Sequence, residues 1–531
     1  MSLNRRTFVE RAGLGTVGSG LLMGTWPTPL VAKEKAPGLP RGNAAAEDVD
    51  PQGILDFVSA IEGSKHELHS LMILRHGRVI TEGWWAPYRP EFNHGMYSMS
   101  KSFTSTAVGL AVDEGRLSTS DKVISFFPES VPAGADERIK DLTVKHLLTM
   151  SVGQKPGSTA PVVKEQDWVK SFLALPLPNG PGTVFSYNSV ATYMLSAIVQ
   201  KLTGETVLEY LTPRLFEPLG IIGSSSNPYW EQCPNGINTG GWGLHIRTEG
   251  LAHLGQLYLQ NGVWEGKQIL SKKWISEATS KQIQQLRNPK SNPDWVQGYG
   301  YQFWRCRHGG YRGDGAFGQF TIVLPKQDAV IVMTGESPSM QDELDLVWKH
   351  LLPSFKDDAV KNRHQASKTL NARMKSLAVA LPKGKTDSPI AKQLNLSRYQ
   401  IAENPLGIQA IGFRLKQGTV TIDVIDAQGA HKIPAGTKEW KFGAAAIPGT
   451  PPRIISGGKP PVGTTAPIVA AAAWKDDRTL VMHWRYYETP HHDTVTCVFE
   501  KDHVEVSFLN SIQKRRGRKN DSRAKLKGTR I

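Results

Sequence analysis

Hydrophobic and polar positions follow two different patterns along the chain. In residues 71–74 and 79–82, short apolar runs flank the turn residues His76-Gly77-Arg78, which is typical of an antiparallel hairpin. Three more strands and a helix are predicted near the far end of the same segment, at residues 299–305, 319–324, 329–334 and 343–352. Between these groups, from residue 103 to about 280, the spacing is mainly helical. The pattern predicts one antiparallel sheet built from both ends of the segment, with helices packed on it and a helical insert.

Residues 395–510 have a different pattern, with short alternating runs separated by turn residues, as in 418–424. This pattern predicts a small all-β domain. The basic, weakly patterned stretch 356–394 is interpreted as a linker, and the Pro-, Gly-, Ala- and acid-rich residues 33–50 as a spacer. The main domain therefore occupies residues 51–355.

Length and composition describe a globular chain of several domains. The 531 residues include 39% hydrophobic and 21% charged residues, which excludes a wholly disordered or collagen-like protein. Three dispersed cysteines, Cys233, Cys306 and Cys497, are too few for a disulfide framework or a cysteine zinc site. Beyond the N-terminal segment, no stretch approaches 18 consecutive apolar residues, so no membrane span is expected.

The net charge of +15 is concentrated near the C-terminus. Between residues 514 and 530 there are nine Lys and Arg residues and one acid, Asp521, and no aromatic residue that could stack on a base. We interpret residues 511–531 as a disordered basic tail that touches anionic polymers without specificity, so no specific nucleic-acid partner is predicted.

The N-terminus contains a candidate export signal. Arg5-Arg6 precede a weakly apolar, glycine-rich stretch at residues 14–26, and Leu30-Val31-Ala32 offers a small residue for cleavage. An amphipathic membrane anchor is the alternative, but four glycines interrupt the short apolar stretch. Residues 1–32 are therefore predicted to be a twin-arginine signal that exports the protein to the periplasm or the medium.

Ser98 and Lys101 form the first candidate chemical motif, S-x-x-K. The same pattern recurs at Ser456–Lys459, Ser511–Lys514 and Ser522–Lys525, but only Ser98 opens a predicted helix, which Gly115 ends. A spacing of three residues on a helix places the hydroxyl and the amine on one face. The helix N-terminus and burial both favour a neutral amine that can act as a base. The alternative is a serine N-cap with a surface lysine.

Two further windows contain groups suited to the same chemistry. Residues 181–189 lead into a predicted helix and carry Tyr187, which could move a proton between a nucleophile and a leaving group if a lysine lies near it. Residues 313–319 are glycine-rich and enter a strand, so a main-chain N–H there could bind an oxyanion. Taken singly, these windows are more commonly explained by a packing tyrosine and by a glycine-rich hairpin.

In this order, the three windows resemble the serine β-lactamase and penicillin-binding-protein superfamily, in particular the branch of class C β-lactamases, related esterases and 6-aminohexanoate-dimer hydrolases. Further similar segments are residues 97–104, 142–149, 240–244 and 319–325. The resemblance covers residues 55–350. It implies an α+β fold, with a five-stranded antiparallel sheet flanked by helices and a helical insert, to which the small C-terminal all-β domain is added.

The resemblance also implies roles for individual residues. Ser98 would be the acylated nucleophile, Lys101 its base, and Tyr187 the group that protonates the leaving group and then activates water. The backbone N–H groups of Ser98 and Gln319 would form the oxyanion hole, and Trp242 would line the substrate site. No metal or organic cofactor is implied.

Two departures from the family pattern bear on the substrate. Ser189 replaces the asparagine of the Y-x-N motif, and Ala316-Phe317-Gly318 replaces K-T-G. The second change removes the cation that faces the carboxylate of a β-lactam, so the substrate-binding residues Ser189, Ala316, Phe317 and Gly318 favour uncharged or differently charged amides and esters.

The sequence thus predicts an exported serine hydrolase that acts on a small-molecule amide or ester, similar to 6-aminohexanoate-dimer hydrolase and class C-type esterases. Two alternatives stay open: a β-lactamase or D-amino-acid peptidase acting on cell-wall substrates, and a non-catalytic cell-wall peptide-binding protein on the same fold. The sequence carries no signal of an oligomeric state.

Overall fold

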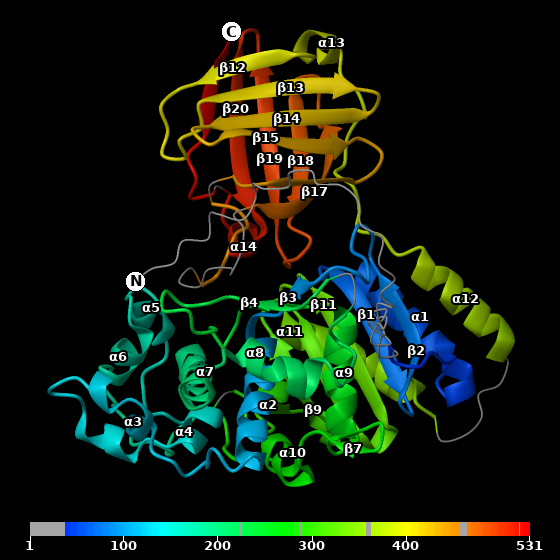
Figure 1. Cartoon of the computed structure of the whole chain (residues 1–531). Coiled ribbons are helices and arrows are strands. Elements are labelled where there is room, and N and C mark those ends of the chain that lie inside the picture. The colour runs from blue at the N-terminus through cyan, green and yellow to red at the C-terminus, as the bar shows by residue number, and fades with distance from the viewer. Residues whose placement is uncertain are drawn as a thin grey trace, which may run out of the picture. The chain divides into compact units, whose positions relative to one another are not determined.

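The computed structural model describes residues 38–223, 226–286, 288–356, 363–447, 449–455, 465–519 and 521–531. Its main domain contains an antiparallel sheet in the order β2-β1-β11-β10-β9-β8 (Figure 1). The strands are β1 (Leu68–Arg75), β2 (Arg78–Trp84), β8 (Trp304–Arg305), β9 (Tyr311–Gly315), β10 (Gln319–Leu324) and β11 (Ala329–Gly335). Strands from both ends of the segment therefore meet in one sheet, as the hydrophobic pattern predicts.

The sheet has six strands rather than the expected five, because the short β8 pairs with the outer side of β9. The prediction at residues 299–305 was wrong except for β8, and β9 was missed altogether. Gly313 and Gly315 give β9 a low intrinsic strand propensity. The hairpin between β1 and β2 and the strands β10 and β11 are confirmed.

Both faces of the sheet are buried, and β1 shows how. Met72 and Leu74 enter one hydrophobic core, while Leu71 and Ile73 enter the other, because successive side chains point to opposite faces. The first core includes residues of α2 (Ser100–Asp113) and α9 (Thr248–Leu259). The second includes residues of α1 (Pro51–Glu62) and α11 (Met340–Leu346). The sheet is therefore the middle layer of three.

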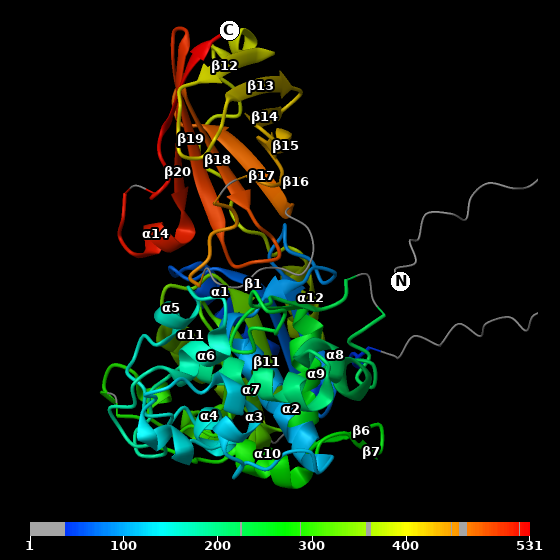
Figure 2. The same cartoon turned by 60° about the vertical axis from the view of Figure 1, so that its left-hand side comes forward.

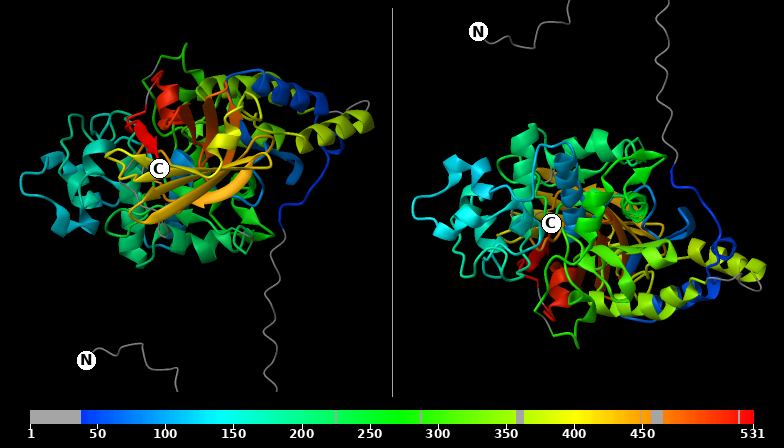
Figure 3. Two further views of the ribbon diagram at one scale, coloured as in Figure 1. Left: turned by 90° about the horizontal axis from the view of Figure 1, so that it is seen from above. Right: turned by 90° about the horizontal axis from the view of Figure 1, so that it is seen from below.

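The segment between β2 and β8 is mainly helical, as predicted. Its other helices are α3 (Val123–Phe126), α4 (Val144–Leu148), α5 (Thr159–Val162), α6 (Trp168–Leu173), α7 (Ser189–Thr203), α8 (Val207–Leu211) and α10 (Lys272–Thr279). Figure 3 shows α3 to α7 on the side of this domain opposite to α1. Across the described part of the chain, no helix combines the length and the apolar character needed to span a membrane.

The predicted linker contains a packed helix, α12 (Arg363–Lys375), which contacts α1 and β2. Leu370, Met374 and Leu377 are buried there. Their helical spacing is obscured in the sequence by the basic residues between them, so the interpretation of this part as a linker missed a packed helix. Gly83 of β2 allows the close approach, since a Cβ at that position would lie 2.6 Å from Cε of Met374.

The part of the predicted spacer that the structure describes also packs on the main domain. Leu39, Ala44 and Val49 are buried, and the Arg41 guanidinium pairs with Glu82 and Glu249. The predicted export signal, residues 1–32, lies outside the described residues.

The C-terminal domain is all-β, as predicted, and forms a closed barrel. Its strands are β12 (Ser397–Ile401), β13 (Ala410–Lys416), β14 (Thr419–Asp426), β15 (Gly429–Gly436), β16 (Lys441–Ala445), β17 (Ala466–Trp474), β18 (Thr479–Arg485), β19 (His492–Glu500), β20 (His503–Asn510) and β21 (Leu526–Arg530). The long strands β17 to β20 lie side by side (Figure 2). A parallel pairing of β15 with β17 closes the barrel around apolar residues such as Trp474 and Trp484.

The basic C-terminal residues belong to this barrel, so the prediction of a disordered tail was wrong. β21 pairs with β12 on one side and β20 on the other, and α14 (Ser511–Arg515) precedes it. Leu526 and Gly528 face inward while the charged and polar residues alternate outward. The Arg523 guanidinium pairs with the carboxylates of Asp493 and Asp521 at 2.7 and 2.8 Å. The net charge of this segment does not reveal that buried and exposed positions alternate along it.

A chain truncated after Lys519 should lose β21 and expose the ladder edges of β12 and β20. The intact closed barrel has no unpaired strand edges, and the truncation creates two of them. We therefore expect a large drop in the melting temperature of the barrel, measured by circular dichroism. The control is the double variant Arg516→Ala, Arg518→Ala, which removes two exposed charges and should melt like the wild type. Equal melting of the truncated and full-length chains would contradict a structural role for β21.

Candidate functional site

Ser98 lies in a 3₁₀ turn, Tyr97–Met99, directly before α2, which begins at Ser100. The turn follows β3 (His94–Gly95), which pairs with β5 (Leu244–Ile246). The end of β9 packs against it so closely that a Cβ on Gly315 would lie 2.1 Å from the Met96 carbonyl oxygen. Glycine is required at that position for close approach, and the predicted helix opening differs from the structure by two residues.

The amine of Lys101 is the centre of the site. Its Nζ donates hydrogen bonds to Ser98 Oγ at 2.9 Å, Ser189 Oγ at 3.0 Å and the Gly241 carbonyl oxygen at 2.6 Å. The residue is only 2% exposed. Burial lowers the pKa of Lys101 to about 7, although the carboxylate of Asp314 opposes the shift. A large fraction of the amine is therefore neutral near neutral pH.

The hydrogen-bond inventory explains how a neutral amine fits the same contacts. A neutral amine has two N–H donors and one lone pair, whereas the ammonium has three donors. The Gly241 carbonyl can only accept, so in the neutral form one serine hydroxyl must donate to Nζ. When that hydroxyl is Ser98, the arrangement is the one needed to remove its proton.

Tyr187 lies beside this pair. Its ring centroid is 4.8 Å from Lys101 Nζ, and the ring stacks on Trp304 with centroids 5.7 Å apart. The next residue, Asn188, caps α7 by accepting the N–H groups of Val190 and Ala191. This cap fixes the segment that presents Tyr187 and Ser189 to the lysine. The structure thus brings Ser98, Lys101, Tyr187 and Ser189 together.

Gly241 was missed as a site residue, although its sequence neighbourhood supported the family resemblance. A Cβ on Gly241 would lie 2.4 Å from the Ser189 carbonyl oxygen. Only glycine therefore allows the backbone at 241 to come close enough for its own carbonyl oxygen to accept from Lys101. The next residue, Trp242, is buried, and its ring stacks on Trp168 with centroids 5.7 Å apart. The doubled glycine at 240–241 was the signal that could have identified the close approach.

Ala316-Phe317-Gly318 form the turn between β9 and β10. Phe317 has a positive φ of 72° and is 5% exposed, and its ring packs edge-on against His491 with centroids 4.6 Å apart. Gly318 also has a positive φ, and a Cβ there would clash with Glu343. The turn is therefore tightly packed, and Phe317 is largely covered by protein.

Gln319 braces this turn from within the sheet. Its side-chain Nε2 donates to the carbonyl oxygens of Ala316 at 3.0 Å and Gly335 at 2.8 Å, and its Oε1 accepts the Gly335 N–H at 3.2 Å. These contacts show how Gln319 holds the hairpin in place. Its backbone N–H as an oxyanion donor stays a prediction.

The barrel contributes residues that sequence analysis missed. His491 Nε2 lies 2.6 Å from the hydroxyl oxygen of Tyr97, the residue before Ser98, and His491 Nδ1 lies 2.7 Å from Glu336 Oε1. His492 Nδ1 lies 2.9 Å from the other oxygen of Glu336. Burial alone would raise the pKa of Glu336, but His492 and His491 outweigh burial and hold that pKa well below its usual range. The carboxylate therefore orients both imidazoles.

Carboxylate and imidazole ligand atoms of Glu67, Glu336 and His492 come within 4.8 Å of one another, close enough to suggest a metal site. Both oxygens of Glu67 accept hydrogen bonds from Arg485, at 2.6 and 3.0 Å, and Glu336 accepts from the two histidines. Since a guanidinium already neutralises Glu67, we interpret this cluster as an ion-pair network between the barrel and the main domain.

Comparison with known proteins identifies a family. The β-lactamase family model matches residues 66–351, more than half of the chain. The 6-aminohexanoate-dimer hydrolase of Paenarthrobacter ureafaciens is 24% identical over 287 residues, 51% of this chain and 72% of that protein. Penicillin-binding protein 4 of Amycolatopsis lactamdurans is 31% identical over 173 residues, 32% of this chain and 43% of that protein.

Solved structures are also similar. The structure of EstCE1, described as a hydrolase with promiscuous acyltransferase activity, matches with a TM-score of 0.47 and 17% identity. The match covers 57% of this chain and 99% of that chain.

The lowered pKa of Lys101 predicts a pH profile. If the neutral amine is the base, kcat/KM for an ester should rise with pH through an apparent pKa near 7 and then level off, because the basic form accumulates as the proton is lost. Lys101→Arg should be almost inactive at every pH, since guanidinium stays charged. A wild-type profile that rises only near pH 10 would show that Lys101 is an ordinary ammonium.

Removing the His491 imidazole should lower turnover through Tyr97. His491→Ala removes the buried imidazole that hydrogen-bonds to the Tyr97 hydroxyl, which costs about 1–3 kcal/mol and disturbs the turn that carries Ser98. We expect kcat to fall roughly tenfold or more. The matched control is His492→Ala, which also removes a partner of Glu336 but not of Tyr97. Equal losses in the two variants would mean that only domain docking is affected.

Proposed function

The chain belongs to the β-lactamase family, and on this basis we propose that it is a serine hydrolase that cleaves small amides or esters through an acyl-enzyme on Ser98. One observation carries the proposal: the buried amine of Lys101 lies 2.9 Å from the hydroxyl oxygen of Ser98, three residues earlier in the chain. Burial lowers the pKa of this amine to about 7, which favours the neutral form that a general base needs.

In the proposed mechanism, Ser98 Oγ attacks the carbonyl carbon while Lys101 takes its proton. The oxyanion that forms is bound by the backbone N–H groups of Ser98 and Gln319. The tetrahedral intermediate collapses, the bond to the leaving group breaks, and Tyr187 passes a proton to that group. Water then attacks the acyl carbon and gives a proton back to Tyr187. The bond between the acyl group and Ser98 Oγ breaks, Lys101 returns its proton to Ser98 Oγ, and the acid leaves.

The departures from the family motifs bear on the substrate. Ser189 retains a hydrogen bond to Lys101 at 3.0 Å, so the shorter side chain supports the base as the family asparagine would. Ala316 supplies no cation for a β-lactam carboxylate. A charge-assisted hydrogen bond is worth roughly 1.5–3 kcal/mol, so its loss disfavours penicillins and cephalosporins by about 10- to 150-fold.

These features support an amidase or esterase similar in activity to 6-aminohexanoate-dimer hydrolase. The alternative of a β-lactamase or D-amino-acid peptidase uses the same acyl-enzyme and differs only in the substrate. A non-catalytic binding protein is disfavoured, because binding alone does not require a buried, near-neutral lysine beside a serine. We also propose export by the twin-arginine route, on the strength of Arg5-Arg6 and the following apolar stretch.

A panel of substrates tests the proposal. Purified wild-type protein should hydrolyse nitrophenyl esters at least tenfold faster than nitrocefin, because Ala316 lacks the ammonium that would bind the β-lactam carboxylate. Ser98→Ala should abolish both turnover and labelling by a fluorophosphonate probe. Ala316→Lys should improve nitrocefin turnover and leave neutral esters little changed.

The nearby Ser100→Ala variant is the control for the nucleophile, since its hydroxyl instead accepts the N–H of Leu244. It should still be labelled. Labelling that survives Ser98→Ala would overturn the assignment of Ser98. Nitrocefin cleaved as fast as the best ester would replace the amidase or esterase proposal with the β-lactamase alternative.

A further inference from the structure

A cavity of about 660 Å³ adjoins the turn that carries Ser98. Met96 and Tyr97 line it on one side, directly before Ser98 in the chain, and Trp242 and Gly243 line it directly after Gly241. Gly95, Tyr229, Glu231 and His245 of the main domain also line it, and the rest of the wall comes from barrel residues in 450–455, 465–467 and 486–490. The cavity therefore lies beside the two segments that contact the Lys101 amine, and its volume suits a small organic molecule.

Glu231 presents a buried carboxylate to this cavity. It directly follows β4 (Tyr229–Trp230), and the residue is 7% exposed. Its Oε1 lies 3.8 Å from the Arg453 guanidinium, and its Oε2 has no hydrogen-bond partner among the described residues. Besides Arg453, the Trp242 side chain interacts with this carboxylate, and its buried oxygens can still accept a further donor from a ligand.

A second carboxylate reaches the cavity from the barrel. Glu488 lies in the loop between β18 and β19 and accepts a hydrogen bond from the Tyr229 hydroxyl at 3.2 Å. Burial raises the pKa of Glu231, with Arg453 and the Trp242 side chain opposing the shift, and burial likewise raises the pKa of Glu488, with Tyr229 opposing it. Neither carboxylate has enough positive charge around it to offset its burial.

The other ionisable side chains of the described lining leave this imbalance in place. Burial lowers the pKa of His245 to about 4, so its imidazole is neutral near pH 7. Arg453 is then the one guanidinium or ammonium of the described lining against two carboxylates. A cationic ligand would complete the charge balance, and a second anion would worsen it.

Apart from three threonines, the rest of the lining is mainly apolar or aromatic. Trp242, Tyr486, Pro451, Pro467 and Ile455 provide walls against which an alkyl chain can pack. The combination of apolar walls and an acidic end matches a chain that ends in a protonated amine.

We propose that this cavity binds the protonated amine of an aliphatic amide or ester substrate, with Glu231 and Glu488 accepting its N–H groups. The inference rests on the proposed function insofar as the ligand is a substrate, because the cavity walls continue into the Ser98 turn. It makes the barrel part of the substrate site, since Glu488 and Arg453 both come from that domain.

Binding to the inactive variant Ser98→Ala tests the site without turnover. Hexylamine and hexanol share a chain and differ in charge, so each is titrated calorimetrically at pH 8. We expect hexylamine to bind at least tenfold more tightly than hexanol. Adding Glu231→Gln, Glu488→Gln or both should weaken hexylamine binding, at least tenfold for the double change, and leave hexanol unchanged.

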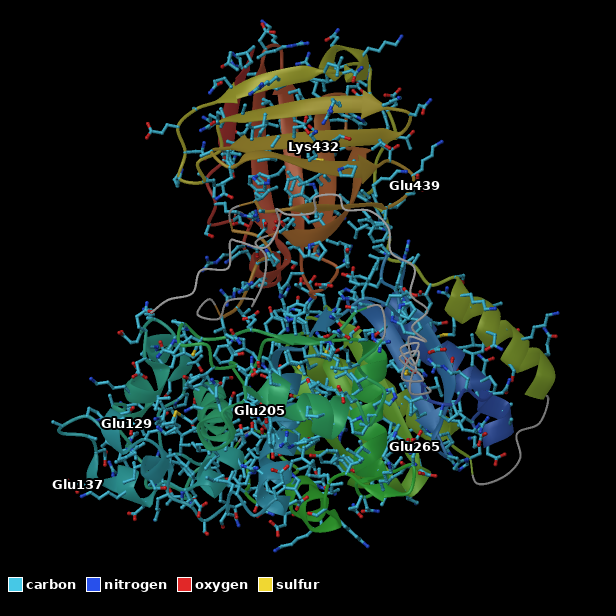
Figure 4. All side chains as sticks on the ribbon, in the orientation of Figure 1. Glu129, Glu137, Glu205, Glu265, Lys432 and Glu439 are labelled. Atoms are coloured by element: carbon cyan, nitrogen blue, oxygen red, sulfur yellow. The ribbon has the colours of Figure 1, made fainter. Side chains whose placement is uncertain are left out.

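The matched control adds Glu137→Gln, a carboxylate on the outer surface of the helical insert whose side chain is 84% exposed (Figure 4). It should leave hexylamine binding unchanged. Glu488→Gln alone changes a half-buried residue, so it keeps the test valid if a Glu231 variant melts early. Equal affinities for hexylamine and hexanol, or unchanged hexylamine binding in a folded glutamine variant, would overturn the proposal.

The outcome is separate from that of the hydrolase assignment. If the wild type hydrolyses no ester but Ser98→Ala binds hexylamine through Glu231 and Glu488, the amine site is supported and the proposed function fails. If the wild type hydrolyses nitrophenyl esters but Ser98→Ala shows no preference for the amine, the hydrolase stands and the amine site is overturned.

Discussion

The burial of one lysine amine is the constraint on which the site depends. An ammonium removed from water is strongly disfavoured unless its three donors are satisfied, and the protein provides two serine hydroxyls and one main-chain carbonyl for Lys101. Three separate segments must converge to supply them: the Ser98 turn, the start of α7 and the loop at Gly241. The packing of α7 against α2 and the glycine at position 241 follow from that requirement. The same burial lowers the pKa of the lysine, so that its neutral form can act as a base.

A second set of buried charges joins the barrel to the main domain. Glu67 and Glu336 lie at the adjacent ends of β1 and β11, and they pair with Arg485, His491 and His492 of the barrel. Because each carboxylate is partnered on both oxygens, separating the two domains would leave buried charges unpaired. The barrel is thereby held where His491 reaches Tyr97 and where Glu488 reaches the cavity beside Ser98. The barrel is therefore part of the surroundings of the nucleophile.

The fold could be predicted wherever the pattern was strong and local. The β1–β2 hairpin, strands β10 and β11, the helical insert and the all-β domain all follow from apolar spacing and turn residues. β9 was missed because its two glycines, needed for close approach to the Ser98 turn, lower its strand propensity. The helix α12 and strand β21 were missed because basic residues dominate their composition, while their few apolar positions become meaningful only against a neighbouring surface.

The sequence by itself predicted the pairing of Ser98 with Lys101, because a separation of three residues in a helical segment places a hydroxyl and an amine on one face. It also identified Tyr187 and Ser189, through the resemblance of their motif. Only the tertiary structure decided which groups complete the site. Gly241 is 140 residues from Lys101 in the chain, and His491 is 394 residues from Tyr97. Contacts at such separations leave no spacing signal, since they arise from the packing of whole elements and from the need of buried polar groups to find partners.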